Sequence, residues 1–334
     1  MIKMKEKNYK REINSLKKEI NLLKRNIRKK FNLVINELQE INYPNKEYEV
    51  VFEEEPLTSY YDGLIEKVTP RKSFKDIVLP KEIKLQLDIA LSQINNHHTL
   101  MQKWKLNKLQ DSNAISLNFA GPPGTGKTLT AEALANELRK KLYIVRYSNL
   151  VDSYIGETGK NIVKVFEIAR RDKAILFFDE ADAIASSRTA IFTSTDSETN
   201  LTRNVLLKEL EKFEGIVIFA TNLVANFDKA FERRISLHMS FKMPNIEDRE
   251  QIWKLLSNNL PLAKNVKFYE LAKEFELTGG HIRNAVLNAA RLAVHNKSNE
   301  VKQEHFISAA KLVKEGYSNL IPQEENKDNL NYLG

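Results

Sequence analysis

The chain has 334 residues, a net charge of +8 and no cysteine. This length allows two or three domains with a sizeable core, and the absence of cysteine excludes disulfides and cysteine-ligated metals. The six histidines show no metal-binding spacing such as H-E-x-x-H, so they predict no metal site. Since no signal segment or bilayer-length apolar run is visible, the sequence predicts a cytoplasmic protein without a membrane partner.

The excess positive charge belongs to the first 30 residues, which hold 12 Lys and Arg against three Glu. Their net charge of +9 leaves −1 for the other 304 residues, so the body of the chain does not look like a general nucleic-acid binder.

Apolar residues recur at steps of three and four from Ile13 to Ile41, with one extra step after Ile27. This heptad pattern with a stutter predicts a coiled-coil helix over residues 1–43. A single amphipathic helix packed on its own domain is the alternative.

Residues 44–70 are predicted to form an acidic connector, because Glu residues cluster between Pro44 and Pro70. Helix and strand patterns then alternate over residues 71–243, which predicts a parallel sheet with helices on both faces. The remaining pattern predicts a small helical lid domain over residues 244–318 and a polar tail over residues 319–334. The expected strands are 115–120, 142–146, 175–178, 216–220 and 237–241, and the expected helices are 81–95, 128–140, 159–171, 200–213, 247–258, 268–275, 279–296 and 302–315.

A glycine-rich octapeptide, GPPGTGKT, follows the first of these strands and precedes a helix. It fits the phosphate-loop pattern G-x-x-x-x-G-K-[ST], in which backbone N–H groups and a helix N-terminus surround a phosphate. We expect Lys127 to reach the β- and γ-phosphates and Thr128 to ligate Mg²⁺. The predicted nucleotide-binding residues of the loop are Gly121, Pro122, Pro123, Gly124, Thr125, Gly126, Lys127 and Thr128.

The apolar strand at residues 175–178 ends in two carboxylates, Asp179 and Glu180. If this strand lies next to the phosphate-loop strand, Asp179 reaches Mg²⁺ beside Thr128, and Glu180 can polarise the attacking water. The simpler interpretation is an ordinary strand end with solvated acids.

Three more residues have candidate roles in phosphoryl transfer. Asn222 ends the strand at residues 216–220 and is suited to positioning the attacking water, although Asn is also a common turn residue. Arg233 and Arg234 follow that strand, and such a pair can stabilise transferred phosphate charge in a neighbouring subunit. A surface pair making ordinary ion pairs is the alternative.

The loop after the second strand carries Tyr154, Ile155 and Gly156. An apolar loop tip of this kind is suited to gripping an extended polypeptide if several copies surround a central pore. An aromatic side chain folded back onto its own domain is the alternative.

Taken in order, GPPGTGKT, YIG, ILFFDEAD, ATN and FDKAFERR, followed by helices with TGGHIRNA, resemble an AAA+ ATPase of the AAA type with a double-Arg second region of homology. The resemblance covers residues 74–315, and its finer detail is similar to bacterial single-ring AAA proteins. It implies a P-loop NTPase α/β large domain with a helical lid, ATP and Mg²⁺ as ligands, and a homo-oligomer, expected to be a hexamer. The implied partner is a protein substrate or adaptor, reached through the N-terminal coiled coil and the central pore.

The resemblance also implies roles for single residues. Gly121–Thr128 with Leu129 look like a Walker A motif, and Asp179 and Glu180 look like the Mg²⁺ and water-activating pair of a Walker B motif. Asn222 looks like sensor 1, Arg233 and Arg234 like arginine fingers, and Tyr154 to Gly156 like the pore loop. The adenine is expected at Ile77, Val78, Gly279 and Gly280. This group usually has Gly-Ala-Asp at the positions where this chain has Gly279, Gly280 and His281. The difference leaves the roles of His281 and Arg283 open.

The sequence thus favours a ring-forming ATPase that remodels, unfolds or disassembles proteins. One alternative is an ATPase of the initiator or helicase-loader kind, in which the basic segment contacts nucleic acid. The other is a nucleotide-gated assembly scaffold without hydrolysis, which the presence of Glu180 disfavours.

Overall fold

The computed structural model describes residues 63–97, 99–106, 114–150, 157–182, 194–222 and 229–318. The predicted coiled coil at 1–43, most of the connector and the polar tail lie outside these described residues, as do Tyr154, Ile155 and Gly156. Among the described residues, no helix combines the length and the apolar character needed to cross a membrane.

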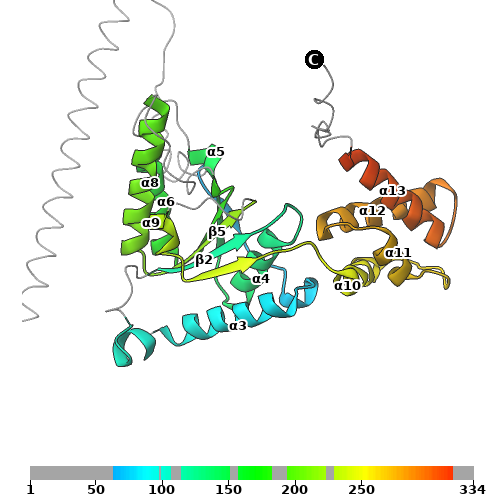
Figure 1. The fold of residues 1–334 in the computed structure, drawn as a ribbon, viewed down its shortest axis with the longest axis horizontal. Helices are drawn as coiled ribbons and strands as arrows, with labels where there is room; N and C mark the ends of the chain where they lie inside the picture. Colours follow the sequence, from blue (N-terminus) through cyan, green and yellow to red (C-terminus); the bar gives the residue numbers. More distant parts are fainter. Residues whose placement is uncertain are drawn as a thin grey trace, which may run out of the picture. The chain divides into compact units, whose positions relative to one another are not determined.

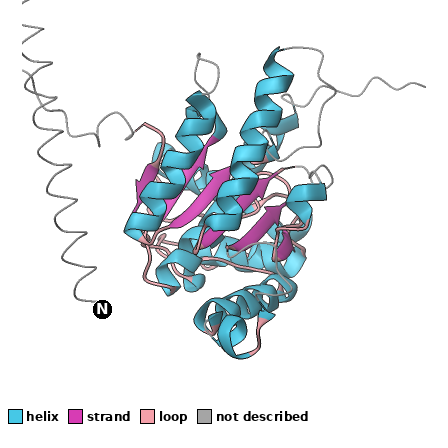
Figure 2. Cartoon of the chain, turned by 90° about the vertical axis from the view of Figure 1, so that its left-hand side faces the viewer, coloured by secondary structure: helices cyan, strands magenta, loops and turns pink. Residues whose placement is uncertain are grey.

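A six-stranded sheet forms the centre of the α/β part, in the order β1-β3-β4-β5-β2-β6. All neighbouring strands pair in parallel except β1, which is antiparallel to β3 at one edge. Figures 1 and 2 show the sheet between two layers of helices, as the alternating pattern predicts. The strands are β1 (Glu66–Val68), β2 (Ile115–Ala120), β3 (Leu142–Arg146), β4 (Ile175–Asp179), β5 (Ile216–Thr221) and β6 (Leu237–Ser240).

The edge strand β1 differs from the sequence prediction, which placed these residues in the acidic connector and expected a parallel sheet. Its three residues, EKV, are too short and too polar to show a strand periodicity. They are held through backbone pairing with β3, where Glu66 lies opposite Ile144, and through an ion pair of 2.8 Å between Glu66 and Arg146. Leu64 and Ile65 just before β1 are buried in the core and fix this edge.

The two faces of the sheet bury two separate apolar clusters, because successive side chains of a strand point to opposite faces. Phe178 and its neighbours on one face pack against α6 (Glu157–Asp172) and α8 (Ser194–Lys212). Phe177 and its neighbours on the other face pack against α3 (Lys81–Asn95) and α4 (Lys127–Glu137). Figure 1 shows these two helix pairs on opposite sides of the sheet. Shorter elements are the 3-10 helix η1 (Phe74–Asp76), the π-helical turn η2 (Thr99–Lys103), α5 (Tyr147–Leu150) and α9 (Lys229–Glu232).

The helices after Pro244 bury a third cluster of their own, in which Trp253 packs edge-on against Phe306. They are α10 (Ile246–Ser257), α11 (Phe268–Glu274), α12 (Gly279–His295) and α13 (Gln303–Ser318). Asn245 caps α10 by accepting a hydrogen bond of 2.7 Å from the Asp248 N–H, which satisfies one of the free donors of a helix start. Helices and a core of their own fit the expected lid domain.

A buried tyrosine anchors β3 to the end of α6. Tyr143 is 1% exposed, and its hydroxyl donates a hydrogen bond of 2.5 Å to the Asp172 carboxylate. Burial and this bond raise the pKa of Tyr143 to about 12. The Arg171 guanidinium, followed by the Tyr143 hydroxyl, lowers the pKa of Asp172 to about 2.

Replacing Tyr143 with Phe is therefore expected to lower the free energy of unfolding by about 1.5–3 kcal/mol, the range for a hydrogen bond to a charged group. Urea unfolding at pH 7 measures this loss. Tyr147→Phe is the matched control, because its ring packs against the same core cluster and should change the stability by less than about 0.5 kcal/mol. An equal effect of both changes would contradict a special role for the Tyr143–Asp172 bond.

Candidate nucleotide-binding site

The phosphate loop lies where the sequence places it, between the end of β2 and the start of α4. Gly121 must be glycine, because a Cβ there would lie 1.9 Å from the Phe241 carbonyl oxygen. Gly124 has a left-handed φ of +76°, which disfavours any side chain. The loop thus wraps tightly and presents its backbone at the N-terminus of an 11-residue helix. This geometry fits an anion such as phosphate.

Lys127 is the buried cation of this loop. Its ammonium donates hydrogen bonds to the carbonyl oxygens of Gly121 at 2.6 Å and Pro122 at 3.0 Å, and to Asn222 Oδ1 at 2.9 Å. Burial lowers the pKa of Lys127, while the nearby carboxylates of Asp179 and Asp182 oppose that shift. The Asn222 contact brings the predicted sensor-1 residue directly to the predicted phosphate-binding lysine.

The strand order corrects one expectation about the acidic pair. We expected the strand ending in Asp179 to lie next to the phosphate-loop strand, but β5 lies between β4 and β2. Helical crossovers allow a strand position to be skipped, and local sequence periodicity does not reveal this. Asp179 still meets the loop, because the carboxyl ends of parallel strands share one edge of the sheet, and Asn222 at the end of β5 fills the position between them.

Glu180 follows Asp179 with an unusual backbone. Its φ of 55° lies in the left-handed region, which costs a residue with a side chain about 1–2 kcal/mol. The Glu180 N–H donates to Asp179 Oδ1 at 3.1 Å. The chain therefore leaves the strand at once, with both carboxylates at the cavity. Strained backbone of this kind clusters at functional sites.

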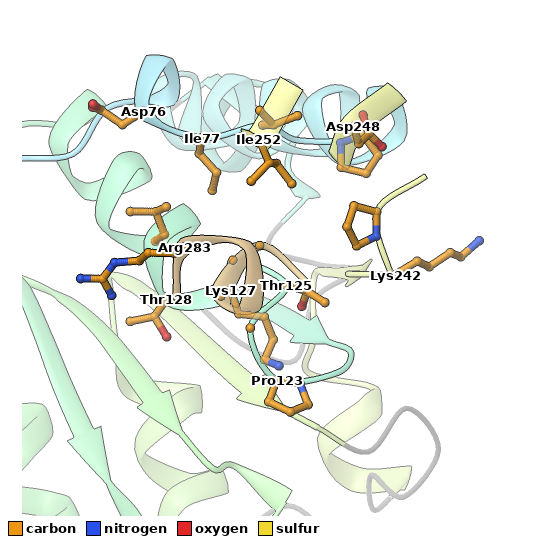
Figure 3. Close-up of a pocket in the computed structure, with 18 of the residues that line it drawn as sticks. Asp76, Ile77, Pro123, Thr125, Lys127, Thr128, Lys242, Asp248, Ile252 and Arg283 are labelled. Atoms are coloured by element: carbon orange, nitrogen blue, oxygen red, sulfur yellow. The ribbon is translucent and has the colours of Figure 1, made fainter. Parts of the chain in front are cut away.

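These groups line one cavity of about 470 Å³, a size typical of a small-ligand site. Figure 3 shows Ile77 and Ile252 on one side of this cavity and Thr125, Lys127 and Thr128 of the loop on the other. The cavity-lining residues that the sequence predicted are Ile77, Val78, Pro123, Gly124, Thr125, Gly126, Lys127, Thr128, Leu129, Asp179, Glu180, Asn222, Gly279 and Gly280. Gly121 and Pro122 contribute through their bonds to Lys127 instead.

Sequence reasoning missed one wall of the cavity. Asp248, Ile252, Leu255 and Leu256 of α10 line it, and burial raises the pKa of the Asp248 carboxyl. In sequence these are ordinary positions of an amphipathic helix, so no local signal marks them as ligand contacts. Arg283, whose role was left open, also lines the cavity from the second turn of α12.

The two candidate arginine fingers lie at the other end of the sheet. Ser236 donates its N–H to the Ser116 carbonyl near the start of β2, whereas the phosphate loop follows Ala120 at the end of that strand. A separation of about five strand residues corresponds to roughly 16 Å. Arg233 and Arg234, just before Ser236, therefore do not line their own chain's cavity.

The two arginines differ in their surroundings. Arg234 donates to the Ala230 carbonyl oxygen at 2.7 Å and forms an ion pair with Glu211, and its own carbonyl accepts a hydrogen bond from the Ser116 hydroxyl. Arg233 is exposed. Arg234 is thus held within its own chain, and Arg233 is the one presented to solvent.

A magnesium ion bound with nucleotide fits the donors at the cavity. The Thr128 hydroxyl and the Asp179 carboxylate both line it, and hard oxygen ligands of this kind suit Mg²⁺ together with phosphate oxygens. Among the described residues, no group of three or more His, Cys, Asp and Glu side chains could hold a metal ion.

Comparison with known proteins identifies the class. Residues 117–243 match the model of the ATPase family associated with various cellular activities (AAA). The chain is 32% identical over 264 residues to the ATP-dependent zinc metalloprotease FtsH 2 of Thermoanaerobacter sp. (strain X514), covering 77% of this chain and 50% of that protein. It is 36% identical over 197 residues to proteasome-activating nucleotidase 1 of Halobacterium salinarum, covering 57% of this chain and 48% of that protein.

A eukaryotic relative is 26S proteasome regulatory subunit 7 homolog B of Arabidopsis thaliana, 35% identical over 205 residues that cover 59% of this chain and 44% of that protein. The chain spans about half the length of these curated relatives or less. Residues 117–243 form an AAA domain of the AAA+ ATPases, a family that implies ATP and Mg²⁺ as ligands of this domain.

Proposed function

We propose that this chain assembles into a ring, expected to be a hexamer, that couples ATP hydrolysis to remodelling, unfolding or disassembly of protein substrates. The observation that carries the catalytic part is the meeting of Lys127, Asp179, Glu180 and Asn222 at one edge of the sheet, in one cavity. The remodelling part rests on similarity to relatives named as proteasome-activating nucleotidases and as an ATP-dependent protease.

In this proposal each side chain has a stated task. The backbone of residues 121–128 and the Lys127 ammonium would bind the β- and γ-phosphates, and Thr128 and Asp179 would hold Mg²⁺, which would neutralise phosphate charge. Glu180 accepts a proton from the attacking water while Asn222 orients that water. The Lys127 ammonium has three donors, which bond to Gly121, Pro122 and Asn222, so binding a phosphate requires it to give up at least one of these bonds.

In the assembled ring, a neighbouring subunit supplies an arginine to each nucleotide site. Since Arg233 lies at the opposite end of the sheet from its own cavity, it acts on nucleotide bound by a neighbouring copy. Arg234 supports it through the bonds to Glu211 and Ala230. Arg283 lines the cavity on the lid side and completes the positive surroundings of the phosphates within the same chain.

The remaining features of the sequence enter the proposal as follows. Residues 71–243 act as the ATPase domain, 244–318 as the lid, and the basic helix at 1–43 as a coiled coil that binds a protein substrate or adaptor. Tyr154, Ile155 and Gly156 line the central pore and grip the substrate. The absence of cysteine supports a cytoplasmic location.

The test uses a chain that binds ATP without turning it over. Tagged Glu180→Gln should capture client proteins from its source cells in the presence of ATP but not of ADP. Glu180→Gln with Tyr154→Ala should capture fewer, because the aromatic tip of the pore loop is lost. Capture that is independent of both nucleotide and Tyr154 would contradict the remodelling proposal.

A nucleic-acid-loading ATPase is the second candidate, favoured by the +9 charge of residues 1–30. It predicts that deletion of residues 1–43 abolishes DNA binding, and that binding by the full chain falls steeply with salt because bound counterions are released. Retained protein capture with no salt-dependent DNA binding would decide for the protein remodeller.

A further inference from the structure

The lid touches the phosphate loop directly, backbone to backbone. The Gly280 N–H, in the first turn of α12, donates a hydrogen bond of 2.9 Å to the Gly124 carbonyl oxygen. Thr278, one residue before α12, is 5% exposed and sits against the same loop residue. We call this contact of Thr278 and Gly280 with Gly124 the lid clasp.

The clasp leaves no room for side chains. A Cβ added to Gly280 would lie 3.1 Å from the Gly124 Cα, and one added to Gly124 would lie 2.7 Å from Thr278 Oγ1. The pair of glycines is therefore explained by the close approach of two backbones. Gly280, which the resemblance places near the adenine, uses its N–H to bond the loop.

Thr278 holds the lid side of the clasp in place. It is the N-cap of α12, and its hydroxyl accepts the His281 N–H at 3.3 Å while its carbonyl accepts the Ile282 N–H at 2.9 Å. Ile282 and Ala285 on the same helix belong to the buried lid core. The position of the lid core is thus transmitted through one helix to the Gly124 carbonyl.

On the loop side, the clasp fixes a peptide plane. The Gly124–Thr125 peptide is trans, so its carbonyl oxygen and the Thr125 N–H point in opposite directions. A lid that holds the Gly124 oxygen on its side directs the Thr125 N–H away from the lid helix. In a phosphate loop these N–H groups are the ones that bind the anion.

We propose that Thr278 and Gly280 are positioning residues, through which the lid orients the Gly124–Thr125 peptide and one phosphate-binding N–H. This inference rests on the proposed nucleotide site and adds that phosphate affinity depends on the lid. A ligand without phosphate should therefore lose less affinity than ADP and ATP when the clasp is altered.

The test compares identical Gly→Ala substitutions at three positions of the lid, using calorimetric titration with Mg-ADP and with adenosine. Gly280→Ala should weaken Mg-ADP binding about tenfold, since it displaces one hydrogen bond, and should weaken adenosine binding by a smaller factor. A Cβ at Gly279 would make only an ordinary contact of 3.5 Å with the Gly124 oxygen, so Gly279→Ala should lie between wild type and Gly280→Ala. A Cβ at Gly316 would meet nothing within 4 Å, so Gly316→Ala should bind both ligands like wild type.

Thr278 provides an independent pair of variants in case Gly280→Ala does not fold. Thr278→Ser keeps the capping hydroxyl and should bind Mg-ADP nearly normally, whereas Thr278→Val, similar in volume, should lose affinity. The thermal unfolding temperature of each variant shows whether its lid is folded. Unchanged Mg-ADP affinity in folded Gly280→Ala and Thr278→Val would overturn the clasp while leaving the ATPase proposal intact.

An equal loss of adenosine affinity would also overturn the proposal, because the clasp would then shape the base pocket. A wild-type chain that binds no Mg-ADP would refute the nucleotide site itself, and the clasp as a phosphate-positioning device with it.

Discussion

Replacing Glu180 with Gln is expected to slow ATP turnover by at least about 100-fold while ATP still binds, because a positioned base contributes 10²–10⁴ to such a rate. The amide has nearly the shape of the carboxylate but cannot accept the proton of the attacking water. The left-handed backbone that sends Glu180 off β4 is retained, since Gln meets the same steric limits. Phosphate release and the Kd for ATP, measured on the same preparation, separate the two effects.

Glu214→Gln is the matched control for this prediction. Glu214 is exposed and precedes β5, at the end of the sheet away from the cavity. The Glu214→Gln variant should therefore hydrolyse ATP at the wild-type rate. Lys127→Ala should give the opposite result, lost ATP binding, because its buried ammonium is the proposed phosphate ligand. Full turnover by Glu180→Gln would remove Glu180 from the water-activating role.

The second large effect is expected at Arg233. Arg233→Ala should reduce turnover by about 100-fold or more with nearly unchanged ATP affinity, because in the proposed ring its target phosphate belongs to a neighbouring subunit. Mixing Arg233→Ala with Lys127→Ala should restore part of the activity, since some mixed interfaces then pair an intact site with an intact arginine. No recovery at any mixing ratio would count against action between subunits.

The two arginines should not be equivalent, because Arg234 is also bonded within its own chain. Arg234→Ala also removes the bonds to Glu211 and Ala230, so it should lower the thermal unfolding temperature as well as turnover. Arg233→Ala, which alters an exposed side chain, should unfold like wild type. Equal thermal stability of the two variants would show that the Arg234 contacts are not structural.

The sequence predicted those parts of the molecule that are encoded locally. The phosphate loop, the strand at residues 115–120 and the helix at residues 81–95 each have a pattern within a few residues, and the structure has these two elements with the same bounds. It did not predict β1, because that strand depends on backbone pairing with β3 rather than on its own side chains.

Residues that meet only through tertiary structure were also missed. The position of β5 between β4 and β2 follows from crossover connections, and the contact of Lys127 with Asn222 depends on that order. The α10 wall of the cavity and the clasp of Gly280 on Gly124 join segments more than 100 residues apart. A single sequence contains no signal for such pairs, although the glycines at both positions are consistent with a close approach.

The dependence of ATPase activity on assembly tests the central claim most directly. ATP hydrolysis per chain should be measured over a wide range of protein concentration, with the oligomeric state determined in the same samples. The account predicts that activity per chain rises steeply as rings form, and that Arg233→Ala assembles without this rise. A constant activity per chain from monomer to assembled state would contradict catalysis shared between neighbouring subunits.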